Sequence, residues 1–187
     1  MLGLVVVVTP ALHGQTVPED AIAAAIQAGL SKKQSGSLIV SGFSSMFTLV
    51  VDGPLTRVQA KASTAAKEYR TFTRADVTAD LLEPVVTITA VPDDPVFNRF
   101  SGWTLTPLAT RIVLQPKAKG AAAIQPTKVE TFPMSWGNAM GGQFQGQGVT
   151  ASFPIGLIPP EDFEAIVITD GREYRMTIKA KDRSKIR

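Results

Sequence analysis

The 187-residue chain contains no cysteine and a single histidine, His13, which lies in an apolar N-terminal segment. Without cysteine, the chain can form no disulfide and can carry no thiol redox chemistry or iron–sulfur cluster. Ser-His-Asp and Cys-His catalysis need an imidazole that exchanges a proton near neutral pH, and zinc sites use cysteine and histidine ligands. One histidine without a partner meets none of these needs, so the composition argues against all of these enzyme and metal-site classes.

Long apolar runs and a strong net charge are also lacking. No stretch reaches the roughly 18 consecutive apolar residues of a membrane-spanning helix. A net charge of +3 is too small for a dedicated nucleic-acid binder. Basic residues do gather at the C-terminus (Lys179, Lys181, Arg183, Lys185 and Arg187, against Asp182). We therefore predict a solvated basic tail over 181–187, with contact to an anionic surface as the alternative.

The motifs of phosphate-binding loops and of nucleophile elbows are absent, and we expect no cofactor. Two acidic pairs remain, Asp93-Asp94 and Glu161-Asp162. Adjacent acids in an extended segment point to opposite faces, so neither pair alone forms a general acid/base couple, and turn or capping roles are favoured. If two of Asp93, Asp94 and Glu161 converge across a cleft, a carboxylate-dependent hydrolase or lyase acting on envelope or extracellular polymers is the alternative function.

Residues 1–15 have the pattern of a secretory signal peptide. An uncharged apolar run from Leu2 to Val8 is followed by Pro10 and by the small-residue ending Ala-Leu-His-Gly. Four consecutive valines also suit a buried β-strand, and no basic residue stands near the start. We expect a signal peptide, and therefore a periplasmic or secreted protein.

Helix signals precede strand signals along the chain. A capping-box spacing at Thr16–Glu19 opens one helix, and Pro54 opens a second. From Pro84 onward, runs of β-branched residues and an Asp170-Gly171 turn between alternating apolar residues predict strands, the last two as a hairpin. We predict an α+β fold, with a helix–strand–helix module over 16–83 and an antiparallel, sandwich-like β-rich module over 84–180.

The best candidates for binding lie in two predicted long loops, over 92–106 and 134–147, each of which holds one tryptophan. Exposed aromatic rings beside amide groups can stack on sugars or dock a partner strand, whereas the alternative is that both rings cap the core. The candidate ligand-binding residues are Trp103, Trp136, Asn138, Gln143 and Phe144. We predict a non-enzymatic binding or structural protein of the cell envelope, whose partner is an envelope protein or polysaccharide.

Three short motifs lie in the first third of the chain. They are Ala-Leu-His-Gly-Gln over 11–15, Val-Pro-Glu-Asp-Ala-Ile over 17–22, and Asp-Gly-Pro-Leu-Thr-Arg over 52–57. With this layout the chain resembles exported proteins of soil acidobacteria that have no assigned activity. The resemblance implies an exported, bacterial location and carries over no catalytic residue.

Overall fold

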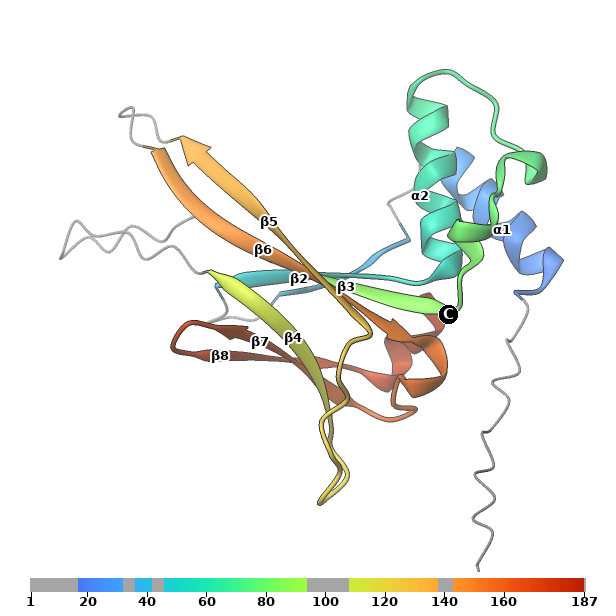
Figure 1. Cartoon of the computed structure of the whole chain (residues 1–187). Coiled ribbons are helices and arrows are strands. Elements are labelled where there is room, and N and C mark those ends of the chain that lie inside the picture. Colours follow the sequence, from blue (N-terminus) through green and yellow to red (C-terminus); the bar gives the residue numbers. More distant parts are fainter. Residues whose placement is uncertain (1–16, 32–35, 42–45, 94–107, 138–142, 187) are drawn as a thin grey trace, which may run out of the picture.

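Two α-helices and two antiparallel β-sheets make up the computed structural model of the chain, which describes residues 17–31, 36–41, 46–93, 108–137 and 143–186 (Figure 1). The arrangement confirms the predicted α+β class with an antiparallel β-rich part. Within the described ranges, no helix is long and apolar enough to cross a membrane. Residues 1–16, which hold the predicted signal peptide and His13, lie outside the described residues.

The larger sheet has five strands in the order β1-β2-β3-β6-β5, and the smaller sheet has three in the order β4-β7-β8. The larger sheet comprises β1 (Leu38–Ser41), β2 (Phe47–Asp52), β3 (Val85–Pro92), β5 (Lys128–Gly137) and β6 (Gln143–Pro154). The smaller comprises β4 (Ala109–Pro116), β7 (Phe163–Thr169) and β8 (Glu173–Ile178). Because β7 pairs with β8 across Asp170-Gly171, the predicted hairpin is confirmed.

The two sheets pack face to face and enclose the main hydrophobic core. Side chains alternate along each strand, so that Phe47, Leu49 and Val51 of β2 are fully buried while the residues between them are not. Both sheets contribute to this core (Val86, Ile88, Ala90, Val149, Ala151 and Phe153 from the larger; Ile112, Leu114, Ala165, Val167, Met176 and Ile178 from the smaller). Since burial of one large apolar side chain contributes roughly 1.5–3 kcal/mol, this two-sheet core is the main source of stability.

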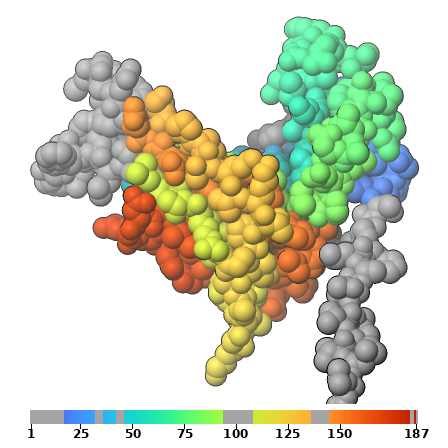
Figure 2. Space-filling view, viewed as in Figure 1, coloured from blue at the N-terminus to red at the C-terminus, as the bar shows by residue number. Residues whose placement is uncertain are grey.

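The helices form a lobe with a small core of its own. Helix α1 (Glu19–Leu30) packs on α2 (Pro54–Lys67), and two 3₁₀-helices, η1 (Arg74–Asp76) and η2 (Ala79–Leu82), close the lobe. The buried residues of the lobe come from α1, α2 and η2 and from the residue that follows η1 (Ile22, Ala25, Ile26, Val58, Val77 and Leu81). Figure 2 shows a hollow between this lobe and the arm formed by β5 and β6.

Arg57 of α2 joins the lobe to the sheet. Its guanidinium group donates hydrogen bonds to three backbone carbonyls, those of Leu81 (3.2 Å), Glu83 (2.6 Å) and Val85 (3.0 Å). Partial burial lowers the pKa of Arg57, because desolvation disfavours its charge, although nearby carboxylates act in the opposite direction. The residue therefore connects α2, the end of η2 and the first residue of β3.

The structure divides the chain differently from the predicted boundary at residues 83 and 84. Strands β1 and β2 precede that boundary, yet β2 pairs with β3 over its whole length, from Phe47 opposite Pro92 to Asp52 opposite Thr87. Both strands also contribute side chains to the two-sheet core. The separate unit is the helical lobe, which is assembled from segments before β1 and between β2 and β3.

The C-terminal segment is a correction to the predicted solvated tail over 181–187. Residues Ala180–Lys185 form a 3₁₀-helix, η4, and Ile186 behind it is only 1% exposed within the main core. A Cβ atom at Gly53 would lie 1.9 Å from the backbone oxygen of Ile186, so the chain end packs tightly against the start of α2. One apolar residue among the basic ones anchors this segment, and Arg183 adds a 3.1 Å hydrogen bond to the backbone oxygen of Ile158.

Candidate functional site

The β5–β6 hairpin extends further toward its tip than the sequence analysis predicted. The two strands pair without interruption from Lys128 opposite Ser152 to Gly137 opposite Gln143. The predicted loop over 134–147 is therefore wrong for 134–137 and 143–147, which are strand. Glycine and glutamine are poor strand formers, but here each pairs with a residue on the neighbouring strand.

The hairpin reaches beyond the sheet that covers its inner face. Strand β4 begins at Ala109, and Leu108 just before it forms an isolated parallel bridge with Gln147. From this point toward the tip of the hairpin, no described strand of the smaller sheet lies opposite. The side of β6 that faces the core in one half of the strand consequently has no described strand of the smaller sheet over its other half.

The sequence of β6 changes character at this position. Val149, Ala151 and Phe153 are all fully buried, and the next two residues on the same face, toward the tip, are Gln147 and Gln145. Their partners on β5 are Pro133 and Ser135. The face of the hairpin that is apolar in the core thus continues toward the tip with other groups. These are the amides of the two glutamines, the hydroxyl of Ser135 and the ring methylenes of Pro133.

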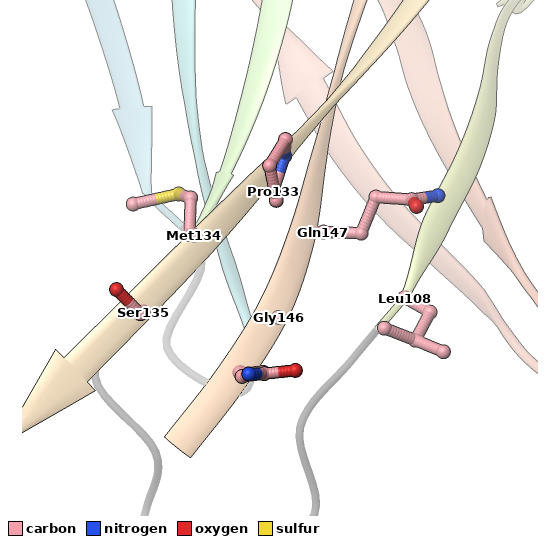
Figure 3. Close-up of a pocket in the computed structure, with 7 residues that line it drawn as sticks. Leu108, Pro133, Met134, Ser135, Gly146 and Gln147 are labelled. Carbon is pink, nitrogen blue, oxygen red and sulfur yellow. The ribbon is translucent and has the colours of Figure 1, made fainter. Parts of the chain in front are cut away.

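A pocket of about 460 Å³ lies on this open face, between the hairpin and the start of β4 (Figure 3). Its lining comprises Leu108, Pro133, Met134, Ser135, Gln145, Gly146 and Gln147, none of which is ionisable. In Figure 3 the side chain of Gln147 extends toward β4. Its Nε2 donates a 2.8 Å hydrogen bond to the backbone oxygen of Ala109, which fixes the hairpin to β4 at the base of the pocket.

A close approach of Phe132 to Gly148 stiffens the hairpin just below the pocket. A Cβ atom at Gly148 would lie 2.2 Å from Cζ of Phe132 and 2.9 Å from the backbone oxygen of Ala90 on β3. The ring therefore lies over the glycine backbone, as aromatic residues do when they cover a glycine on the adjacent strand. Only glycine leaves room for this contact, so the position is fixed by packing.

The predicted ligand-binding residues fall at the distal end of the same hairpin. The register places Trp136 directly opposite Phe144, and Gly137 opposite Gln143. Two residues that line the pocket, Ser135 and Gln145, are thus the immediate sequence neighbours of Trp136 and Phe144. Trp103 and Asn138 lie outside the described residues.

Sequence reasoning missed the pocket residues themselves. The available signal was the repeat of glutamine at alternate positions 143, 145 and 147, directly before the apolar alternation of β6. The contribution of Leu108 had no local signal, because it depends on where β4 meets the hairpin.

The acidic residues considered for catalysis do not come together. Asp93 follows the last residue of β3 and accepts a 2.7 Å hydrogen bond from the hydroxyl of Thr48. Glu161 lies seven residues beyond Pro154, which pairs with Val85 at the other end of β3, and the eight extended residues of β3 span about 23 Å. Asp94 lies outside the described residues. In the part of the chain that the structure describes, no group of three or more His, Cys, Asp or Glu side chains could hold a metal ion.

Two acids with lowered pKa values, Asp76 and Asp162, lie away from the pocket and accept hydrogen bonds from backbone N–H groups. The pKa of Asp76 is lowered chiefly because its carboxylate accepts a hydrogen bond from the N–H of Thr73, at the start of η1. The pKa of Asp162 is lowered chiefly by the N–H of Ala180, 2.8 Å away, which opens η4. The capping role expected for acids of this kind is thus seen at Asp162, and the pocket remains free of charge.

Comparison with protein-family models, with curated proteins and with solved structures found no match for this chain. The class of this protein is therefore defined by its architecture alone. It is an antiparallel two-sheet sandwich with a helical lobe at one end and an uncharged pocket beside an overhanging hairpin.

Proposed function

We propose that this chain is an exported, non-enzymatic binding protein that holds a segment of neutral polysaccharide at the overhanging end of its β5–β6 hairpin. The observation that carries the proposal is the uncharged pocket formed where the inner face of the hairpin leaves the cover of the smaller sheet. Export rests on the signal-peptide pattern of residues 1–15 and on the resemblance to exported acidobacterial proteins.

The lining of the pocket favours a neutral, hydroxyl-rich ligand. Gln145 and Ser135 offer amide and hydroxyl groups that both donate and accept hydrogen bonds, and both are exposed. Pro133 and Leu108 add apolar surface, which suits the CH faces of a sugar ring. A phosphate or carboxylate ligand would find no cation among these residues, so anionic polymers are not favoured.

The open form of the site favours a polymer segment over a small metabolite. The pocket lies at the surface, between an edge strand and the start of β4, and is lined partly by exposed residues. Trp136 and Phe144 come next along the hairpin toward its tip, where they pair with one another. Aromatic residues in such positions can stack on successive sugar units.

Calorimetric titration of the full chain with neutral oligosaccharides (gluco-, manno-, galacto- and N-acetylglucosamine series) tests the proposal. We expect binding to at least one series, weakened at least tenfold by Gln145→Ala and by Trp136→Ala. Gln27→Ala, which removes the same side chain from the exposed face of α1, is the matched control and leaves affinity unchanged. No binding to any series, or equal loss in the control, contradicts the proposal.

The alternative function predicted from the sequence is a carboxylate-dependent hydrolase or lyase, but no observation favours it over binding. Asp93 lies just beyond one end of β3, whereas Glu161 lies seven residues beyond Pro154 at the other end, so no described contact brings the two carboxylates together to flank one glycosidic bond, which requires roughly 5–10 Å. Release of reducing ends from any of the same oligosaccharides, lost in Asp93→Asn, would favour the hydrolase instead.

A further inference from the structure

Strand β5 is an edge strand with an open flank. It lies last in the order β1-β2-β3-β6-β5 and pairs only with β6 among the described strands. Residues 127–131 are all exposed, including the side chain of Val129 at 40%. Figure 2 shows the segment around the start of β5, in yellow to light orange, on the near side of the molecule with nothing in front of it. A free edge of this kind is a template for pairing with another strand.

Pro133 determines which backbone groups face the open flank. Proline has no N–H, so within a sheet it occupies positions whose N–H side faces away from the neighbouring strand. In antiparallel strands this direction alternates from one residue to the next. Val129 and Thr131 therefore share the orientation of Pro133 and direct their N–H and C=O groups outward.

Among the two-fold axes that pass through residues 128 to 131, one gives a register of a second copy of β5 that avoids unfavourable contacts. A two-fold axis must place outward-facing residues opposite one another, so it passes through a residue and not between two. An axis at Lys128 sets Lys128 against itself, and an axis at Glu130 sets two carboxylates together. An axis at Thr131 brings Pro133, which lacks a donor, opposite Val129. An axis at Val129 avoids all three conflicts.

We propose that the chain forms a symmetric dimer through antiparallel pairing of β5 with β5 of a second copy, centred on Val129. In this register Lys128 of each copy lies opposite Glu130 of the other, and the two Val129 residues exchange backbone hydrogen bonds. The stretch Lys-Val-Glu is thus complementary to itself in charge and in shape. Directly opposed charges of unlike sign stabilise strand pairs, whereas like charges destabilise them.

The charges at this flank are already arranged for such a network. Within one copy, Nζ of Lys128 lies 2.7 Å from Oε1 of Glu130, on one face of the strand, with both side chains about two-thirds exposed (66% and 62%). Pairing surrounds each lysine with two carboxylates. Because exposed ion pairs contribute little individually, the dimer is weak and depends on concentration. The pocket, which lies further along the hairpin, stays open in each copy.

Sedimentation velocity over a range of concentrations, with the full chain, tests the dimer. We expect the wild-type chain to dimerise, and Lys128→Glu and Glu130→Lys each to abolish the dimer by opposing like charges. The double variant Lys128→Glu/Glu130→Lys restores charge complementarity and with it the dimer. Lys119→Glu, an exposed charge reversal away from the flank, is the control. A wild-type chain that stays monomeric, or a double variant that does not recover, overturns the proposal.

Cysteine cross-linking tests the register, since the chain has no cysteine of its own. In Val129→Cys the two thiols lie opposite one another across the axis, so mild oxidation yields a covalent dimer. In Thr131→Cys the two thiols are displaced by four residues, about 13 Å along the strands, and cross-link poorly. Equal or reversed yields contradict pairing at Val129. A dimer that forms without either cross-link assigns the contact to another surface.

Discussion

Replacing Arg57 with methionine should separate the helical lobe from the sheet. Methionine retains most of the aliphatic stem but removes the three hydrogen bonds to the carbonyls of Leu81, Glu83 and Val85. The bond to Glu83 is exposed, so water can replace it, while the other two are partly buried. At about 1.5 kcal/mol for each partly buried bond to a charged donor, we expect a loss of about 3 kcal/mol in the free energy of unfolding.

Urea unfolding followed by circular dichroism measures this loss. We expect a lower midpoint, with either a reduced slope or a separate early transition, because α2 holds a core distinct from that of the sheets. Arg70→Met is the control, since Arg70 is exposed and its guanidinium pairs with the nearby Glu68 side chain. That change should stay within about 0.5 kcal/mol of wild type. If Arg57→Met loses no more than Arg70→Met, the guanidinium does not join the two parts.

Three further variants test other contacts. Gly148→Ala places a methyl group against Phe132 and the β3 backbone, and should lower the free energy of unfolding by about 1–3 kcal/mol in chemical denaturation; unchanged stability would mean that the ring does not cover this glycine. Ile186→Ala removes a core side chain and should lower the free energy of unfolding by about 2–4 kcal/mol, whereas a solvated tail predicts no loss. The pKa of Asp76 is lowered in the folded state, so its stabilising contribution is present at neutral pH and declines as pH falls below about 4. Asp76→Asn should therefore flatten the acid side of the stability–pH curve; an unchanged acid limb contradicts the capping role.

Local signals in the sequence predicted most of the elements, because their causes are local. Pro54 at the first position of α2 and the Asp170-Gly171 turn between β7 and β8 were both recognised from residue chemistry alone. Helix α1 begins at Glu19, three residues after Thr16, and its N-cap is Pro18 in place of the Thr16 cap that the spacing predicted. Helix starts are set by competing caps, and more than one was present here.

Features that depend on distant partners were not predicted. Nothing near β1 and β2 shows that they pair toward β3 across a helical insertion, so the boundary at residue 84 was misplaced. The burial of Ile186 depends on its contact with Gly53, more than a hundred residues earlier. Likewise, the glutamines of β6 mark a pocket only because the smaller sheet ends at Leu108.

The candidate ligand-binding residues stay a prediction, and the sequence did not point to the residues that line the pocket. Aromatic residues beside glycine and amide groups drew attention to the segment around Trp136 and Phe144, and the hairpin that carries them does border the pocket. The lining residues Ser135, Gln145 and Gln147 are ordinary polar residues without a motif. Only the ending of the opposing strand distinguishes them from other exposed strand positions.

An NMR titration of the isotope-labelled chain with the neutral oligosaccharide that binds best locates the binding surface residue by residue. We expect backbone amide shifts to change with ligand concentration at positions 134–136 and 144–147 and at Leu108, while the helical lobe and η4 stay unperturbed. Shift changes centred on another surface, or none at saturating concentrations of every oligosaccharide series, would contradict a carbohydrate site on the β5–β6 hairpin.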